Sequence, residues 1–341
     1  MEAKGQFVLT VASTYLKAAF DACVEEGCAP NALLKKIPNG SATFEDPLLR
    51  VRCEVFIELL HEAERLLGQT GIGLKVGLSF RPSTFLDFGY ALFSCDNLRE
   101  ALKFNRTYQS VNQQLGRAAL KEMPDRTYIE WDSPFEAEFV RPATEAIMTG
   151  YLMLGMRMTW SEGHEARKMR FRHNRPEHAD VVSSLFDCAV SYNEPVDQFE
   201  FNPDLVDRPM PARNPALVKT LCHRLDVVLE SIDQPDSTSL AAYRLLEMRL
   251  ADGVPSILDV ARDLGMSERT LRRRLNSEGE SFRDILKRVR RAICEIYLSE
   301  GNRSMSEIAG LLGYSEHSAF SRAFRDWFDM TPTEYVNEDT R

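Results

Sequence analysis

Long apolar runs, paired cysteines and low-complexity tracts are all missing from this sequence of 341 residues. The most apolar stretch, residues 146–158, is interrupted by Arg157 and is shorter than the roughly 20 residues that span a bilayer, so we expect a buried helix there. The first residues lack a basic segment followed by an apolar core, which argues against a secretory signal. These absences predict a cytoplasmic chain without a membrane partner.

The cysteines and histidines show no arrangement that is typical of a metal site. The seven cysteines are scattered and include no CxxC pair, so we expect reduced, mostly buried thiols, no metal and no cofactor. His164, His173 and His178 lie close in sequence without a zinc-ligand spacing, and we expect them to be solvated or hydrogen-bonded.

Two short motifs suggest enzymatic chemistry, but each departs from its pattern. Residues 71–77 (GIGLKVG) approach a dinucleotide-binding loop, yet the third glycine is one place late, and we expect a turn and a short strand instead. Residues 221–224 (LCHR) resemble the Cys-His-Arg core of DNA alkyltransferases, with Leu221 where those enzymes have proline. We therefore expect no enzyme, and DNA alkyl transfer by Cys222 stays as an alternative.

The net charge of −9 is unevenly distributed along the chain. Residues 240–341 hold 16 Lys and Arg against 17 Asp and Glu, a net −1, whereas residues 1–239 hold 26 against 34, a net −8. Nine basic residues fall within the segment 269–291. Local clustering governs contact with phosphates, because screening limits the reach of a charge to about 10 Å. The acidic total therefore does not exclude DNA binding by the last third of the chain.

A polar break at residues 231–239, with Pro235 and three serines, predicts a boundary between two domains. We expect domains at 1–232 and 240–341, joined by a linker at 233–239. Helical and alternating patterns mix in the first domain, which predicts an α+β fold. The expected helices are 11–23, 48–67, 216–232 and 240–250, and the expected strands are 127–131 and 168–173.

An internal repeat occupies the second domain. Residues 261–270 (ARDLGMSERT) match residues 309–318 (AGLLGYSEHS) at a constant offset of 48 residues, in their Ala, Leu, Gly, Ser and Glu positions. In each copy an apolar first helix ends at a glycine, Gly265 or Gly313, which favours a left-handed turn before the next helix. This arrangement is typical of a helix-turn-helix unit. We therefore expect an all-α DNA-binding domain with two such units.

The second helix of each copy is predicted to be amphipathic, with Ser267 and Ser315 as N-caps. The expected inward residues are Leu271 and Leu275 in the first copy and Phe320 and Phe324 in the second. The expected outward residues are Arg269, Arg272 and Arg273 in the first copy and His317, Ser318, Ser321 and Arg322 in the second. Such a helix fits the major groove of DNA, where arginine side chains bind guanine edges.

A long helix is predicted between the two copies, over residues 282–298. It would hold the two units at a fixed separation. Recognition helices that enter successive major grooves on one face of DNA lie about 34 Å apart.

Residues 240–341 resemble the DNA-binding domain of the AraC/XylS family of bacterial transcription regulators. The resemblance rests on VAxxLGMSxRTLxR at 260–273, EGxSF at 278–282, IAxxLGYSxxSxFxRAF at 308–324 and TPxxY at 331–335. Two positions depart from the family pattern, which usually has glycine where Asp329 stands and arginine where Val336 stands.

The resemblance implies roles for the outward residues. Arg269, Arg272, Arg273, His317, Ser318, Ser321 and Arg322 match base-reading positions. Phosphate contacts are expected from Ser267, Arg274, Lys287, Arg303 and Ser315. For Arg274 a structural role is equally open.

Residues 1–232 resemble the effector domain of an arabinose-binding-like subgroup of the same family. The matching motifs are GLKVG at 73–77, LxxALxxxxxY at 98–108, FxHxxP at 171–176 and VxxFxF at 196–201. The subgroup's name does not establish arabinose as the ligand. The resemblance implies a regulatory domain that binds a small-molecule effector and dimerises, in a bacterial, nucleoid-associated protein.

We therefore expect a sequence-specific transcription regulator, and the family resemblance implies an activator. Its expected partners are double-stranded promoter DNA with paired half-sites, RNA polymerase, a small-molecule effector and a second copy of the chain. The alternative is a regulator that is controlled by a protein partner or by abundance, with a first domain that senses nothing. Effector-binding residues are not assigned, because the aromatic residues Phe80, Phe85, Phe88, Tyr90 and Phe93 fit a pocket and a core equally well.

Overall fold

The chain forms two compact units, residues 1–221 and residues 222–341. The computed structural model describes residues 8–47, 49–124, 126–161, 166–233, 237–250, 253–300, 303–314, 316–332 and 334–335. The division falls inside helix α9 (Pro215–Asp233), because the later part of α9 contributes Val227 to the apolar core of the second unit. Helix α10 starts at Thr238, inside the expected linker 233–239, and residues 234–236 lie outside the described residues. The domain and linker limits stay a prediction.

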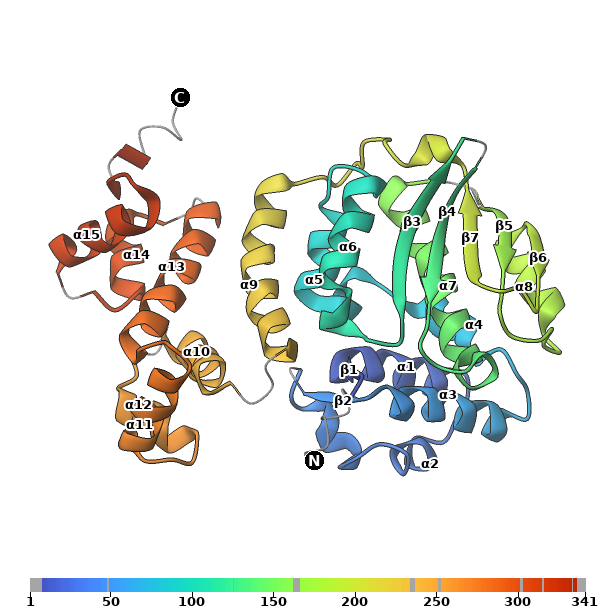
Figure 1. The fold of residues 1–341 in the computed structure, drawn as a ribbon, viewed down its shortest axis with the longest axis horizontal. Helices are drawn as coiled ribbons and strands as arrows, with labels where there is room; N and C mark the ends of the chain where they lie inside the picture. The colour runs from blue at the N-terminus through green and yellow to red at the C-terminus, as the bar shows by residue number, and fades with distance from the viewer. Residues whose placement is uncertain are drawn as a thin grey trace, which may run out of the picture. The chain divides into compact units, whose positions relative to one another are not determined.

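A five-stranded sheet of order β3-β4-β7-β5-β6 is the centre of the first unit (Figure 1). Its strands are β3 (Arg117–Met123), β4 (Arg126–Asp132), β5 (Ala166–Arg170), β6 (Ala189–Ser191) and β7 (Asp197–Phe201). Every neighbouring pair is antiparallel except β5 and β6. The expected strand 127–131 is confirmed as part of β4, and the expected strand 168–173 is confirmed only as far as Arg170.

Helices make up most of the remainder of the first unit. They are α1 (Ser13–Glu25), α2 (Pro30–Leu34), α3 (Cys53–Leu67), α4 (Ile72–Ser79), α5 (Leu86–Phe93), α6 (Leu98–Asn112), α7 (Ala137–Thr159) and α8 (Ala179–Phe186). Short 3-10 helices are η1 (Gly40–Phe44), η2 (Pro82–Phe85) and η3 (Pro203–Leu205). The expected helices 11–23 and 48–67 each start later, because β1 (Thr10–Ala12) and β2 (Arg50–Arg52) form a two-stranded sheet in front of them. Among the described helices, none is long and apolar enough to cross a membrane.

The expected short strand at residues 71–77 is wrong, because a helix, α4, follows the turn at Gly71. Gly73 and Gly77 lie one helical turn apart and face the backbone of α7. A β-carbon on Gly73 would lie 2.1 Å from the carbonyl oxygen of Pro142, and one on Gly77 would lie 2.5 Å from that of Ala146. The glycines therefore serve close helix packing, not phosphate binding. Helix α7 confirms the expected buried helix at residues 146–158.

The second unit is all-helical among its described residues. Its helices are the end of α9, then α10 (Thr238–Arg249), α11 (Ile257–Asp263), α12 (Glu268–Ser277), α13 (Phe282–Glu300), α14 (Met305–Leu311) and α15 (His317–Phe328). The expected helices 216–232, 240–250 and 282–298 are confirmed within a few residues as α9, α10 and α13. The chain is thus mostly helical, with a sheet in the first unit and a helical second unit.

The two copies of the repeat fold alike. Gly265 and Gly313 have φ values of 67° and 72°, the left-handed conformation that glycine adopts without strain. The first helix of each copy begins with a capping box, from Ser256 in α11 and from Ser304 in α14, at the same 48-residue offset. Local capping and turn signals therefore agree with the repeat in both copies.

Candidate nucleic-acid interface and ligand cavity

Helix α12 has an apolar seam and a basic outer face. Leu271 and Leu275 are almost completely buried, as the repeat predicts. Successive residues are rotated by about 100° around a helix, so Arg269 and Arg273 lie roughly opposite that seam. Both arginines are exposed, and no ion pair joins either of them to another described residue. They are available to a ligand that approaches the outer face.

The flanks of α12 hold further polar groups. Arg272 pairs with Glu268 at 2.8 Å, so its guanidinium must leave or share that carboxylate to reach a base. Arg274 is exposed on the other flank, beside the apolar seam. Asn276 is exposed near Arg273 on the outer face and was not predicted as a base-reading residue. Its amide suits the edge of adenine, and its position on the helix is the signal that could have identified it from the sequence.

Helix α15 repeats this arrangement in the second copy. Phe320, Phe324 and Trp327 are buried and form its apolar seam. Ser318 and Arg322 lie roughly opposite the seam, and both are exposed. The two predicted recognition helices therefore present comparable outward positions.

Two further side chains lie on a flank of α15. The Ser321 hydroxyl and the His317 ring nitrogen Nδ1 are 3.3 Å apart and form a hydrogen bond. Arg325 is exposed on the outer face, one turn after Ser321, and was not among the predicted base-reading residues. The outer face of α15 thus carries two arginines, Arg322 and Arg325.

The predicted phosphate-contacting residues differ in what already engages them. Ser267 caps α12 by accepting a hydrogen bond of 3.2 Å from the Thr270 amide. Lys287 pairs with Asp326 at 3.4 Å. Ser315, the expected cap of α15, lies outside the described residues, and Glu316 precedes the first residue of that helix without a side-chain cap.

Two other arginines have mainly structural surroundings. Arg303 is half-buried, and its guanidinium lies 4.4 Å from the ring centre of Tyr297. Arg290 donates to the carbonyl oxygens of Leu312 and Gly313 at 2.9 and 3.2 Å, which ties α13 to the turn of the second copy. Part of the basic stretch 269–291 therefore holds the fold together.

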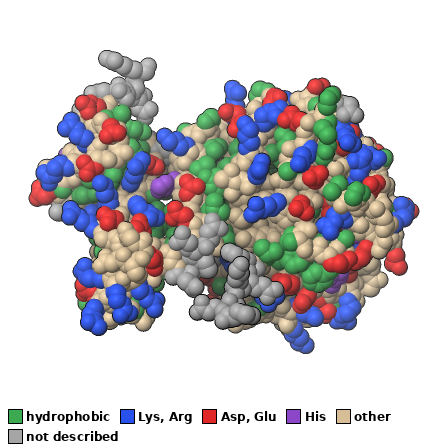
Figure 2. Space-filling model, in the orientation of Figure 1, with side chains coloured by type: hydrophobic (Ala, Val, Ile, Leu, Met, Phe, Trp, Pro, Cys, Tyr) green, Lys and Arg blue, Asp and Glu red, His purple; other side chains and the backbone are tan. Residues whose placement is uncertain are grey.

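The surface distribution of charge agrees with these positions. Lys and Arg side chains gather at the end of the second unit where α11 and α12 lie (Figure 2). A basic patch of this kind attracts nucleic-acid phosphates, while the net charge of the chain stays negative.

His173 and His178 of the first unit are hydrogen-bonded, as expected. His178 donates from Nε2 to the carboxylate of Glu145 at 2.9 Å, and its Nδ1 forms a hydrogen bond of 2.7 Å with the hydroxyl of Thr70. His173 is buried, which lowers the pKa of its ring, and its Nδ1 lies 2.8 Å from the carbonyl oxygen of Asn174. His164 lies outside the described residues. The described residues hold no group of three metal-ligating side chains.

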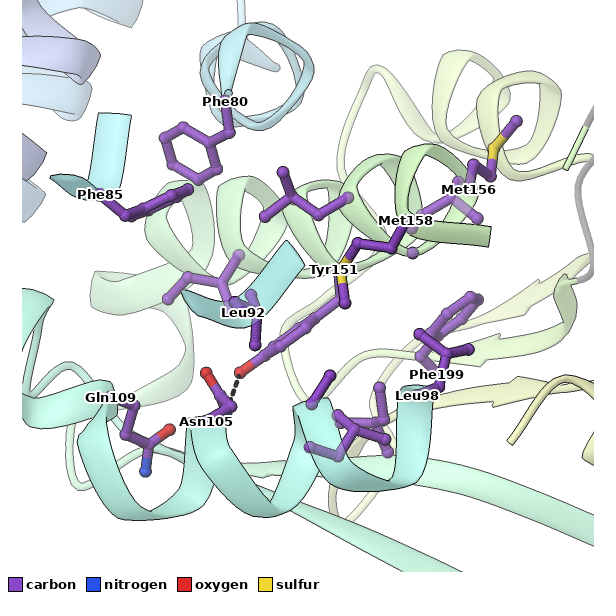
Figure 3. Close-up of a pocket in the computed structure, with 18 of the residues that line it drawn as sticks. Phe80, Phe85, Leu92, Leu98, Asn105, Gln109, Tyr151, Met156, Met158 and Phe199 are labelled. Atoms are coloured by element: carbon purple, nitrogen blue, oxygen red, sulfur yellow. Dashed lines mark hydrogen bonds between the residues drawn. The ribbon is translucent and has the colours of Figure 1, made fainter. Parts of the chain in front are cut away.

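A cavity lies within the first unit, between the sheet and helices α5, α6 and α7 (Figure 3). Its empty volume is about 1070 Å³, counting the mouth. Of the aromatic residues left open between pocket and core, Phe80, Phe85 and Phe88 line the cavity, while Tyr90 is half exposed. Cys222, the residue of the alternative alkyl-transfer reaction, is half-buried in α9 and is not among the residues that line the cavity.

Comparison with known proteins connects both units to one kind of protein. Residues 27–210 match the family model described as "Arabinose-binding domain of AraC transcription regulator, N-term", and residues 260–338 match a helix-turn-helix domain model. The chain is 28% identical to the ornithine utilization regulator of Pseudomonas aeruginosa over 330 residues, 94% of each chain.

Three other similarities cover shorter stretches or are weaker. The chain is 35% identical over 172 residues to the regulator VirS of Mycobacterium tuberculosis, 50% of this chain and 49% of that protein. It is 38% identical over 77 residues to the urease operon transcriptional activator of Escherichia coli, 23% of this chain and 26% of that protein. The crystal structure of the regulator CdpR from Pseudomonas aeruginosa aligns over 94% of this chain and 97% of its own, with a TM-score of 0.46 and 21% identity.

Proposed function

The chain belongs to the AraC family of transcription regulators, and from this premise we propose that it binds promoter DNA through two helix-turn-helix units joined by α13. The observation that carries the proposal is the pair α12 and α15, in which equivalent helices of a repeat expose a polar face opposite a buried apolar seam. Helix α13 has 19 residues and is therefore about 28 Å long. That length suits two recognition helices placed one turn of DNA apart.

Within this proposal, the outward residues divide the work of recognition. Arg269 and Arg273 of α12, and Ser318 and Arg322 of α15, read base edges. The flanking residues Arg272, His317 and Ser321 complete the two reading surfaces. Contacts with phosphate come from Ser267, Arg274, Lys287, Arg303 and Ser315, with Lys287 and Arg303 limited by their present partners.

Capture of genomic DNA by the full chain tests the two-unit reading. Fragments are bound at physiological salt and sequenced, and we expect enrichment of sites with two short conserved clusters about one helical turn apart. The variants Arg273→Ala and Arg322→Ala should each weaken the base preference in one of the two conserved clusters and leave the preference in the other unchanged, because each helix reads its own half of the site. Uniform binding, or loss of preference in both clusters at once, contradicts the proposal.

We also propose that a small molecule bound by the first unit controls transcription, that the chain dimerises and that it activates RNA polymerase. The match to an effector-domain model and the cavity support the first part. The urease operon relative, named as an activator, supports the last part. A ligand changes an equilibrium only when it binds one state more tightly than the other.

A screen for ligand-induced stabilisation separates this proposal from control by a protein partner or by abundance. A ligand at 100 times its dissociation constant stabilises the state that binds it by about 2.7 kcal/mol, which a thermal melt resolves. Stabilisation of the full chain, together with a changed affinity for the captured DNA sites, is expected. A broad panel without any shift favours the alternative.

A further inference from the structure

Resting on the proposed ligand-controlled function, we infer that the cavity of the first unit takes an uncharged, largely apolar small molecule that has one hydrogen-bond acceptor. The family model that matches this unit is named after arabinose, and one relative is named after ornithine. The cavity fits neither chemistry.

The walls of the cavity carry no charged side chain. Helices α5, α6 and α7 and strands β4 and β7 line it with aromatic and aliphatic groups, and no Asp, Glu, Lys, Arg or His is among the lining residues. Arg81, just before η2, and Arg157 of α7 are neighbours of lining residues. Both donate instead to the backbone carbonyls of Leu78 and Phe80. An ionised ligand would therefore lose its hydration without gaining a partner, which costs several kcal/mol.

A sugar or an amino acid is disfavoured for this reason. Ornithine carries charges at both of its ends, and arabinose carries a hydroxyl group on nearly every carbon. Each buried hydroxyl without a hydrogen bond weakens binding, because the hydration that it loses is not replaced. A site for arabinose needs several convergent polar groups. Here Asn105, Gln109 and Tyr151 lie on one side of the cavity, whereas the hydroxyls of Thr159 and Ser161, at the end of α7, bond to each other at 2.7 Å.

That polar side is formed by α6 and the middle of α7 (Figure 3). Asn105 donates from Nδ2 to the Tyr151 hydroxyl oxygen at 3.3 Å, which leaves the proton of Tyr151 free to donate in turn. Burial raises the pKa of Tyr151, so the hydroxyl keeps this proton. Gln109 already accepts from the Ala118 amide at 3.2 Å. Tyr151 is thus the group that would bind an acceptor oxygen of the ligand, such as that of an alcohol, a ketone or an ester.

Gly155 provides room for the apolar part of the ligand. It lies one helical turn after Tyr151 and three residues before Met158, on the face of α7 that lines the cavity. A β-carbon on Gly155 would meet no other atom within 4 Å. The empty space of about 1070 Å³, which includes open solvent at the mouth, adjoins this glycine.

The test uses the neutral fluorophore N-phenyl-1-naphthylamine and the full chain. We expect saturable binding of the probe, which decan-1-ol displaces. Decanoate, with the same chain length but a carboxylate, should displace it at least tenfold less well, and L-arabinose and L-ornithine should not displace it. Displacement by either of these two at a lower concentration than decan-1-ol, or no saturable binding of the probe, overturns the inference.

Three variants place the probe in this cavity. Gly155→Leu fills the space and should weaken probe binding at least tenfold, while Gly155→Ala should keep it. Tyr151→Phe should weaken displacement by decan-1-ol about two- to tenfold, the effect of one hydrogen bond. Equal probe binding by Gly155→Leu and the unchanged chain refutes the assignment.

Failure here is distinguishable from failure of the proposed function. If a charged or hydroxylated ligand stabilises the chain and changes its affinity for DNA, ligand control stands and only the chemical class is wrong. A thermal melt of each variant shows whether it is folded, and the comparison of decan-1-ol with decanoate requires no variant.

Discussion

Replacement of Arg273 by alanine tests base reading most directly. Arg273 lies on the outer face of α12, opposite Leu271 and Leu275, and it makes no ion pair with another described residue. Binding therefore breaks no existing contact of this side chain. Removing a bidentate arginine–guanine contact costs about 1–3 kcal/mol, which is roughly a 5- to 150-fold loss of affinity for the specific site.

Arg272 provides an internal comparison for this value. Its guanidinium pairs with Glu268, and an exposed ion pair contributes about 0–1 kcal/mol. Part of any gain from DNA binding by Arg272 is offset by weakening that pair. We therefore expect Arg272→Ala to cost less than Arg273→Ala on the same site.

The assay is a titration of labelled DNA at several salt concentrations, on the captured site and on a random duplex. Arg273→Ala should lower affinity for the captured site, relax preference at one base position and leave binding to random DNA nearly unchanged. Arg262→Ala removes the same charge from an exposed arginine of α11 and serves as the control. Equal losses on both duplexes for Arg273→Ala would refute base reading and assign this side chain to phosphate.

Three stability predictions follow from the packing, each measured by urea unfolding of the full chain. Gly73→Ala places a β-carbon against the Pro142 carbonyl and should cost about 1–3 kcal/mol, whereas Gly155→Ala should cost nothing. Asp329 has a φ of 58° where glycine carries no strain, so Asp329→Gly should stabilise the second unit by about 0.5–1 kcal/mol; a loss would contradict this. Burial alone would raise the pKa of Glu278, but hydrogen bonds from the start of α10 have the larger, opposite effect and lower the pKa to about 2. Because the pKa of Glu278 is lower in the folded state, the stabilisation that it provides is complete above about pH 5 and is lost as the pH falls toward 2. After allowance for solvent exposure, Glu278→Gln should cost about 1 kcal/mol of folding free energy at pH 7 and much less near pH 3.

The second unit could be predicted almost element by element. The 48-residue offset, the glycines at 265 and 313 and the spacing of buried residues each describe local structure, and local signals determine helices and turns. The departure at Asp329 is also explained, because this residue keeps the left-handed conformation that ends α15. Arg325 and Asn276, in the last turns of α15 and α12, were not predicted, because their exposure depends on how far each helix extends.

The first unit was less accessible to prediction, because its features depend on contacts between distant segments. Gly73 and Gly77 gave a pattern that fits a turn and strand, whereas their function is to let α4 approach α7, about 70 residues later in the chain. The cavity likewise combines residues from Tyr15 to Leu205. No single segment contains the information that Phe80 faces a cavity while Tyr90 faces solvent.

The contact between α4 and α7 also bears on the kinetics of ligand entry. Gly73 meets the α7 backbone near one end of this contact, and Arg157 donates to backbone carbonyls at the end of α4, so α7, which lines the cavity, is held to α4 at two points. Helix α6 is joined to α7 by the side-chain hydrogen bond from Asn105 to Tyr151. A side-chain contact opens at lower cost than backbone packing, so we expect association and release rates to follow the opening of α6. Amide hydrogens of α6 should accordingly exchange with solvent sooner than those of α4.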